Sequence, residues 1–301
     1  METILITGGT GVVGRHLSHG LAEKGYKVCI LSRSETKVPG IRHYFWDPVR
    51  NKIDPEAVAA ADCIIHLAGA NIGEKRWTKK RKQELYDSRI KTGELILENI
   101  RTSGRKLRAF ISASATGYYG MTTSGKIYME TDEAAPDFTG ELCRQWENVA
   151  DRFSETGART VRIRSGVVLT RRGGALGRIS TLARAGLASA LGTGKQYFPW
   201  IHVDDICGIY IKAVEDTSLN GAFNAVGPGH ITNRDFMKAV AVSLNKPFIA
   251  PNVPSYVMRL VFGEMAGMLL EGSRVSPEKI ISAGYDFRFK SAGDALKDLF
   301  G

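Results

Sequence analysis

Residues 3–14 read TILITGGTGVVG, a short β-branched run that passes directly into a glycine-rich turn. The run at residues 3–7 is typical of a buried strand, and the apolar spacing that follows as far as residue 24 is typical of an amphipathic helix. Because side chains in such a turn would keep a pyrophosphate away from the backbone N–H groups, the GxxGxxG spacing favours a phosphate site over an ordinary glycine-rich turn. The residues predicted at the phosphates are Gly8, Gly9, Thr10, Gly11, Val12 and Val13.

The alternation of strand and helix continues along the chain. Near-continuous apolar runs at 26–32, 62–67, 108–112 and 160–169 are typical of strands buried on both faces of a parallel sheet. Helical patterns lie between them at 78–101 and 141–155. This order predicts an α/β fold of the Rossmann type, with a doubly wound parallel sheet.

The character of the sequence changes after Leu169, where the glycine-rich stretches RRGGALG and LGTGK appear and the last fifty residues carry apolar helical patterns. We therefore expect a dinucleotide-binding domain at 1–169, completed by residues from 200–227. Residues 170–301 are expected to form a smaller substrate lobe, mainly helical over 250–301, at the carboxyl edge of the sheet.

The end of the second predicted strand indicates which dinucleotide binds. NAD sites place a carboxylate there for the ribose 2′-hydroxyl, whereas NADP sites supply an arginine for the 2′-phosphate. Here Ser32 and Arg33 are followed by Ser34, and the first acid, Glu35, comes later. The guanidinium fork of Arg33 suits a phosphate, with Ser32 or Ser34 adding a hydroxyl, so the predicted cofactor is NADP.

The composition favours a globular protein that binds a small anionic ligand, over membrane, disulfide-rich and nucleic-acid-binding proteins. The 301 residues are 43% hydrophobic and 24% charged, without an apolar run long enough for a membrane span, so we expect a cytoplasmic protein. The four cysteines are scattered, which argues against a disulfide framework. The net charge of +10 fits an anionic small-molecule substrate better than nucleic acid, although residues 75–82 read KRWTKKRK. The oligomeric state stays open.

Several stretches together resemble the extended short-chain dehydrogenase/reductase superfamily, and within it the atypical epimerase branch with its own C-terminal helical domain. The resemblance covers nearly the whole chain and rests on the glycine loop, Leu67-Ala68-Gly69, Asp87-Ser88-Arg89, RSGVVL at 164–169, FPWIHVDD at 198–205 and LLEG at 269–272.

The resemblance also implies roles for residues outside the glycine loop. Leu67, Ala68 and Gly69 would lie along the adenosine side of the cofactor. Glu84 and Arg89 would approach its ribose and phosphates, and Val167 would lie near the nicotinamide amide. Without the family, the Leu67 segment would simply end a strand, and Arg89 would as readily be a solvated helix residue.

The superfamily's chemistry uses a serine, a tyrosine and a lysine, with the last two spaced Y-x-x-x-K. Ser114 matches the serine, but Thr139 and Cys143 stand where the tyrosine and lysine are expected. Tyr118, Tyr119 or Lys195 are candidates for a displaced acid, although the two tyrosines can equally serve in aromatic packing. We therefore keep two hypotheses: an NADP-dependent oxidoreductase or epimerase acting on a nucleotide-linked or phosphorylated sugar, and a non-catalytic NADPH-binding regulatory module.

A metal site is the weaker interpretation of His202, Asp204 and Asp205. In an extended segment, His202 and Asp204 would share one side and Asp205 would face the other. No further cluster of ligand residues stands out in the sequence, so we predict no metal.

Overall fold

The computed structural model describes residues 1–33, 40–171 and 173–301. Within them lies an eight-stranded sheet with the order β11-β8-β6-β5-β1-β2-β3-β4. Neighbouring strands are parallel except for the pair β3 and β4, so the predicted doubly wound parallel sheet is confirmed. The strands are β1 Thr3–Thr7, β2 Lys27–Ser32, β3 Arg42–Asp47, β4 Lys52–Ile53, β5 Cys63–His66, β6 Ala109–Ala115, β8 Arg159–Ser165 and β11 Gly221–Ala225.

The strand order reverses between β1 and β5. From β1 the chain continues to β2 and β3 on one side, whereas β5, β6, β8 and β11 follow on the other. Ile6 of β1 is paired with Ile30 of β2 and with Ile65 of β5. The carboxyl ends of β1 and β5 therefore form the switch point at which open α/β sheets bind ligands.

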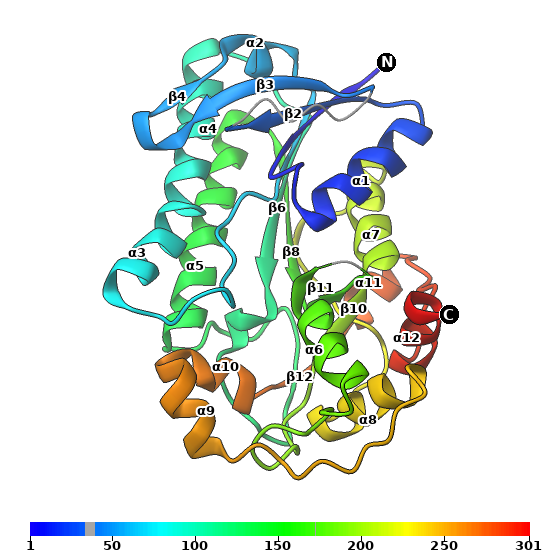
Figure 1. Cartoon of the computed structure of the whole chain (residues 1–301). Coiled ribbons are helices and arrows are strands. Elements are labelled where there is room, and N and C mark those ends of the chain that lie inside the picture. Colours follow the sequence, from blue (N-terminus) through cyan, green and yellow to red (C-terminus); the bar gives the residue numbers. More distant parts are fainter. Residues whose placement is uncertain (34–39, 172) are drawn as a thin grey trace.

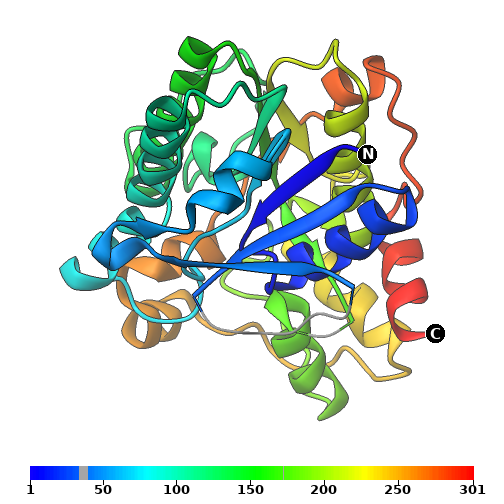
Figure 2. The same cartoon turned by 90° about the horizontal axis from the view of Figure 1, so that it is seen from above.

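Helices cover both faces of the sheet (Figure 1). On one face α1 (Val12–Glu23) and α7 (Val203–Glu215) pack on Ile6, Ile111 and Ile163. On the other, α2 (Pro55–Ala60), α4 (Ile90–Ser103) and α5 (Phe138–Asp151) pack on Leu5 and Phe110. Figure 2 shows the N-terminal strands between these two layers. None of the helices in the described residues is both long and apolar enough to cross a bilayer.

Helices α6 (Gly174–Arg184), α8 (Asn233–Ser243), α9 (Ser255–Phe262), α10 (Ala266–Leu270) and α12 (Ala292–Phe300) lie in the lower half of Figure 1, whereas α11 (Glu278–Ser282) packs beside β11. One apolar cluster joins three of the helices, through residues such as Leu176, Phe236 and Leu296. Short strand pairs, β9 with β10 and β7 with β12, connect this region to the main sheet. The remaining elements are α3 Lys79–Asp87, β7 Ile127–Tyr128, β9 Val167–Leu169, β10 Trp200–His202 and β12 Arg274–Val275.

Two predicted elements are each divided in the structure. The helix expected at 78–101 is α3 and α4, separated at Ser88 and Arg89, where Ser88 Oγ accepts the Ala70 N–H at 2.9 Å. The strand expected at 160–169 is β8 and β9, separated at Gly166. A Cβ on Gly166 would lie 2.6 Å from the Pro199 carbonyl oxygen, so the chain passes closely beside that residue as it leaves the main sheet.

The expected extended run through residue 205 is wrong. Strand β10 ends at His202, and α7 begins at Val203. His202 Nδ1 accepts the backbone N–H of Asp204 at 3.1 Å, which caps the first turn of the helix. Asp204 and Asp205 therefore lie in the first turn of a helix that His202 caps, and the strand-like alternation of these three residues is absent.

Candidate functional site

The glycine turn leaves an open helix N-terminus at the carboxyl end of β1. Gly8 has a φ of +70°, and its carbonyl accepts the Gly11 N–H at 2.9 Å. A Cβ on Gly14 would lie 2.4 Å from the same carbonyl oxygen, so this glycine is required for the turn to close. At Gly11, by contrast, a Cβ would meet only the Gly8 oxygen at 3.2 Å among the described atoms. The exposed side of the turn is thus free for a phosphate.

The neighbouring residues of the turn have separate structural roles. Gly9 packs on the side chain of Ile30, which a Cβ would approach to 2.6 Å. Thr10 and Val13 are half-buried, whereas Val12 is exposed. The first turn of α1 reads Val12-Val13-Gly14-Arg15 and contains no carboxylate that would repel an anion.

The end of β2 lies next to this turn in the sheet. Ser32 is buried as the last residue of the strand, and Arg33 follows it exposed to solvent. Ser34 and Glu35, which also entered the cofactor prediction, lie outside the described residues. A cation therefore follows the strand next to the glycine turn, at the position where the NADP prediction requires one.

The end of β5 borders the turn from the other side. A Cβ on Gly8 would lie 2.8 Å from the Leu67 carbonyl carbon, and Thr7 Oγ1 accepts the Ala68 N–H at 3.2 Å. Gly69 comes next, and a Cβ there would lie 3.0 Å from the guanidinium carbon of Arg89. Leu67, Ala68 and Gly69 thus lie between the glycine turn and Arg89.

Glu84 and Arg89, paired in the sequence analysis, occupy different environments. The Arg89 guanidinium is buried and donates to the carbonyls of Ala70 at 2.9 Å and Leu85 at 3.1 Å. The Glu84 carboxylate is exposed and forms an ion pair with Arg81 at 2.7 Å. The structure places Arg89 beside the strand end and directs Glu84 toward Arg81.

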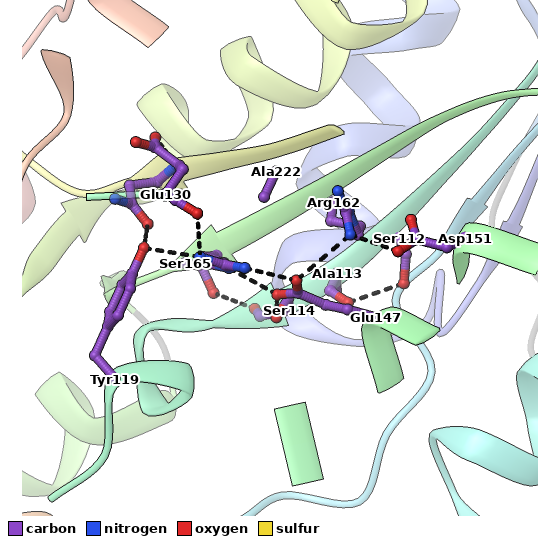
Figure 3. Close-up of polar contacts among 12 residues, drawn as sticks. Ser112, Ala113, Ser114, Tyr119, Glu130, Glu147, Asp151, Arg162, Ser165 and Ala222 are labelled. Carbon is purple, nitrogen blue, oxygen red and sulfur yellow. Dashed lines mark hydrogen bonds and ion pairs between the residues drawn. The ribbon is translucent and has the colours of Figure 1, made fainter. Parts of the chain in front are cut away.

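Ser114 and Tyr119 belong to one buried polar network (Figure 3). Ser114 Oγ donates to Glu147 at 2.6 Å, and Arg164 binds both oxygens of that carboxylate at 2.8 Å. Arg164 also donates to the Tyr119 hydroxyl at 3.0 Å, which in turn donates to Asn224 at 2.6 Å. Ser114 is 2% exposed and Tyr119 1%. Both hydroxyl hydrogens are therefore engaged inside the protein.

Burial and ion pairing determine the protonation states of Tyr119 and Arg164 in this network. Burial raises the pKa of the Tyr119 hydroxyl to about 12, although Arg164 opposes that shift. Burial alone would lower the pKa of Arg164, but its bonds to Glu147 raise it above the ordinary value. Tyr119 is therefore a neutral phenol at physiological pH, and Arg164 keeps its charge.

Sequence reasoning missed Glu147, Arg164 and Asn224 as members of this network. What could have revealed them in the sequence is a polar residue at a position where the pattern predicts burial. Glu147 lies on the buried face of α5, and Arg164 is a buried residue of strand β8. Buried charges of this kind are stable when they are paired, which predicts partners on neighbouring elements without identifying them.

Tyr118 differs from Tyr119. It is half-buried, and the guanidinium of Arg164 lies 3.4 Å from the centre of its ring. Its ring packs beside Val226 and Val275. In the described part of the chain its hydroxyl has no hydrogen-bond partner and is not enclosed. Of the three candidate hydroxyls, Tyr118 is therefore the one left available to a ligand.

Thr139 and Cys143 stand on the first turns of α5, facing Gly117. The Thr139 hydroxyl donates to Asp137 at 2.7 Å. Cys143 is buried, and burial raises the pKa of its thiol to about 12. Thus neither position supplies a cation or a proton donor suited to neutral pH.

Val167 begins β9, directly after Gly166, and is half-buried. Its N–H donates to the Pro199 carbonyl at 2.7 Å.

In residues 1–33, 40–171 and 173–301, no group of three or more His, Cys, Asp or Glu side chains is arranged to hold a metal ion.

Comparison with known proteins identifies the family. The sequence profile of the NAD dependent epimerase/dehydratase family matches residues 4–227. This chain belongs to the NAD-dependent epimerase/dehydratase family. A second profile, described as domain of unknown function DUF1731, matches residues 253–299, where the family resemblance had indicated a separate C-terminal part.

Relatives of this epimerase/dehydratase chain match it over nearly its whole length. Epimerase family protein SDR39U1 of Mus musculus is 35% identical, covering 98% of this chain and 99% of its own. The crystal structure of human SDR39U1 isoform 2 with NADPH has 33% identity and a TM-score of 0.87, covering 99% and 98% of the two chains. The NADPH in that structure agrees with the cofactor expected from the sequence.

A nucleoside-diphosphate sugar epimerase from Corynebacterium glutamicum is also similar in structure. It has 32% identity and a TM-score of 0.80. The match covers 99% of this chain and 58% of that one, so the bacterial relative is the longer chain.

Proposed function

We propose that this protein binds NADP(H) and acts as an oxidoreductase or epimerase of the extended short-chain dehydrogenase type. Its substrate would be a nucleotide-linked or phosphorylated sugar. The observation that carries the proposal is the open phosphate turn at Gly11, with the exposed Arg33 at the end of the adjacent strand. A helix N-terminus free of carboxylates suits a pyrophosphate, and a guanidinium suits a 2′-phosphate.

The residues around the turn fit a dinucleotide. The backbone from Gly11 to Val13 would hold the pyrophosphate, and Ser32 with Arg33 would hold the adenosine phosphate. Leu67 and Ala68 would flank the adenosine, and Val167 the nicotinamide end. The bound cofactor supplies a hydride donor or acceptor, and the protein's contribution is binding, orientation and proton handling.

Tyr118 is the proposed proton donor or acceptor for the substrate oxygen. Its hydroxyl is accessible, whereas those of Ser114 and Tyr119 are bound within the protein. The Arg164 guanidinium lies 3.4 Å from the centre of the Tyr118 ring, but it is bonded to both carboxylate oxygens of Glu147 and is not a free cation like the family's lysine. We therefore expect slow proton transfer compared with a site that holds a tyrosine and a free lysine.

Positive charge supports an anionic substrate. The net charge is +10, and the exposed Arg178 of α6 donates to the Gly73 carbonyl at 2.8 Å. This guanidinium therefore lies beside the loop that follows β5, with a neutral partner. A phosphate or nucleotide group is the kind of ligand that such a cation favours.

A second candidate function is that of a non-catalytic NADPH-binding regulatory module. The observation that favours it is the pair Thr139 and Cys143, which stand where the catalytic tyrosine and lysine are expected. Under this alternative the cofactor binds and changes the protein's conformation or its affinity for a partner, and no substrate is turned over.

The test combines binding with turnover. Titration calorimetry should detect NADPH binding that Gly11→Val abolishes, because a branched side chain there blocks the backbone from the pyrophosphate. Absorbance at 340 nm with a panel of sugar nucleotides and carbonyl compounds then separates the two candidates. Turnover that Tyr118→Phe lowers by about 10²- to 10⁴-fold, while Tyr119→Phe and Ser114→Ala lower it less, supports the enzyme with Tyr118 as acid. NADPH binding without turnover supports the regulatory module, and absence of NADPH binding overturns both.

A further inference from the structure

Helix α9 carries large apolar side chains on the face that it turns to solvent. Tyr256 and Leu260 are four residues apart, so they share one face, and they are 74% and 76% exposed. Val261, next to Leu260, is 52% exposed. Met258 points the other way, into a buried cluster with α10. The helix is therefore apolar on two sides, and the described part of the chain covers only one of them.

The exposed apolar side chains are concentrated near this helix. Among the described residues, thirteen large hydrophobic side chains are exposed, and four of them lie within 249–261, including Ile249 at 82%. Scattered apolar residues are ordinary on a protein surface, whereas a group of them marks an interaction site. Between residues 246 and 263 the sequence has two cations, Lys246 and Arg259, and no carboxylate. An anionic partner would therefore meet no repelling charge on this stretch.

A strongly basic segment precedes and begins α3. It is the run KRWTKKRK at 75–82, for which the proposed function gives no role. Its two inner cations, Arg81 and Lys82, form ion pairs with the nearby acids Glu74, Glu84 and Glu264. Four further cations are exposed and have no ion-pair partner among the described residues: Lys75, Arg76, Lys79 and Lys80. These four charges are available to a partner.

Two contacts hold the basic segment against the end of α9. Lys82 Nζ forms an ion pair with Glu264 at 2.7 Å, and a Cβ on Gly263 would lie 2.8 Å from a guanidinium nitrogen of Arg76. Gly263 directly follows the last residue of α9. Both helices also lie on the same side of the molecule in Figure 1 and in Figure 2. The unpaired cations and the exposed apolar side chains thus form one surface, the α3–α9 surface, made of residues 75–80 and 249–261.

We propose that the α3–α9 surface docks on a membrane that contains anionic lipids. Tyr256, Leu260 and Val261 would enter the boundary between headgroups and acyl chains, and the cations would lie among the lipid phosphates. Docking of this kind is peripheral and needs no membrane-spanning helix. Nucleic acid would bind the same cations, but it has no use for exposed leucine and valine. The inference is independent of the proposed function.

The first experiment measures how much of the purified full chain sediments with vesicles of two compositions. One is phosphatidylcholine alone, and the other is equal parts of phosphatidylcholine and phosphatidylglycerol. We expect at least about tenfold tighter binding to the anionic vesicles, weakening as salt is added, because ions screen the lipid charge. No binding to the anionic vesicles at low salt, or equal binding to both compositions, would overturn the proposal.

Charge is tested by removing two lysines of the basic segment together, Lys79→Gln and Lys80→Gln. The matched control removes Lys27 and Lys106, two exposed lysines at the amino ends of β2 and β6, in the same way. Each lysine near an anionic surface contributes roughly fivefold in affinity, so we expect the first pair to weaken vesicle binding about ten- to thirtyfold. The control should bind as the wild type does. Equal losses in the two double variants would show that the docking surface lies elsewhere.

Apolar insertion is tested at Leu260. Leu260→Ser should weaken binding to the anionic vesicles by about tenfold, since a buried leucine is replaced by a polar side chain. Val242→Ser on α8, where the valine is 63% exposed, is the control and should have no effect. Melting temperatures equal to that of the wild type check that neither exposed substitution disturbs the fold. Unchanged vesicle binding in Leu260→Ser contradicts the proposal.

A fluorescent label reports which face meets the bilayer. The four native cysteines are buried, so Leu260→Cys introduces an accessible thiol for an environment-sensitive dye, with Val242→Cys as the matched control. We expect the emission of the dye at residue 260 to shift to the blue on anionic vesicles, and the emission at residue 242 to stay unchanged. Vesicle binding without a shift at residue 260 would place the contact on another face and overturn the proposal.

Other occupants of this surface give different results. A second copy of this chain would appear as a dimer in sedimentation velocity without vesicles, and Leu260→Ser would dissociate it. Nucleic acid would appear as binding of a single-stranded RNA oligonucleotide that the Lys79→Gln, Lys80→Gln variant weakens. Either result, from a protein that does not bind anionic vesicles, overturns the proposal. NADPH titration tests the proposed function separately, because residue 260 lies outside the proposed cofactor site and Leu260→Ser should bind NADPH as the wild type does.

Discussion

Arg33 is exposed at the end of β2, where a single guanidinium can separate NADPH from NADH. A charge-assisted hydrogen bond to the 2′-phosphate contributes about 1.5 to 3 kcal/mol, which corresponds to roughly a ten- to hundredfold preference. We predict that Arg33→Ala weakens NADPH binding by this factor and leaves NADH binding nearly unchanged. Calorimetry with both cofactors measures the ratio, and Arg42→Ala on the neighbouring strand is the control. Equal weakening of both cofactors would show that Arg33 does not contact the phosphate.

His66 gives the fold a defined dependence on pH. It is buried on β5, its Nδ1 is 2.8 Å from the Thr7 hydroxyl, and burial lowers its pKa to about 4 from an ordinary 6.5. The neutral ring is thus favoured in the folded state. The lowered pKa of His66 makes the free energy of unfolding depend on pH. The stability is full above pH 6.5, and about 3 kcal/mol of it is lost as the pH falls from 6.5 toward 4, because the unfolded chain binds the proton first. Urea unfolding between pH 7 and 4 should show a steeper loss for wild type than for His66→Asn; parallel curves would contradict this assignment.

At the scale of elements, the network of Glu147 and Arg164 joins α5 to β8 and, through Ser114, to β6. Glu147→Gln leaves the buried Arg164 without its carboxylate, and breaking a buried ion pair typically costs about 3 to 5 kcal/mol. Ser114→Ala removes one hydrogen bond and leaves the pair intact, at a cost of about 1 kcal/mol. We therefore predict that urea unfolding ranks Glu147→Gln as much the less stable variant. Equal losses would mean that the ion pair adds little to the packing of α5.

At the scale of the molecule, Asp205 ties the C-terminal segment to the sheet layer. Its buried carboxylate, on the first turn of α7, accepts the N–H groups of Arg288 at 2.8 Å and Phe289 at 3.2 Å. Asp205→Ala leaves both donors unpaired, at about 1 to 3 kcal/mol each. We predict a melting temperature lower by several degrees, and faster proteolysis near residue 288. The exposed Asp286→Ala serves as the control, and equal melting temperatures for the two variants would refute this role.

The amino-acid sequence was enough to predict the parallel sheet and the glycine turn, because both depend on local patterns: apolar runs of strand length, and glycines at fixed spacing between a strand and a helix. It also showed that residues 139 and 143 depart from the expected tyrosine and lysine. Which polar groups meet, by contrast, depends on how distant segments pack together. Ser114 and Glu147 are 33 positions apart, and Tyr119 and Asn224 are 105 apart, so no local pattern records those bonds. The break at Arg89 likewise depends on a hydrogen bond from Ala70 to Ser88, which local helix propensity does not contain.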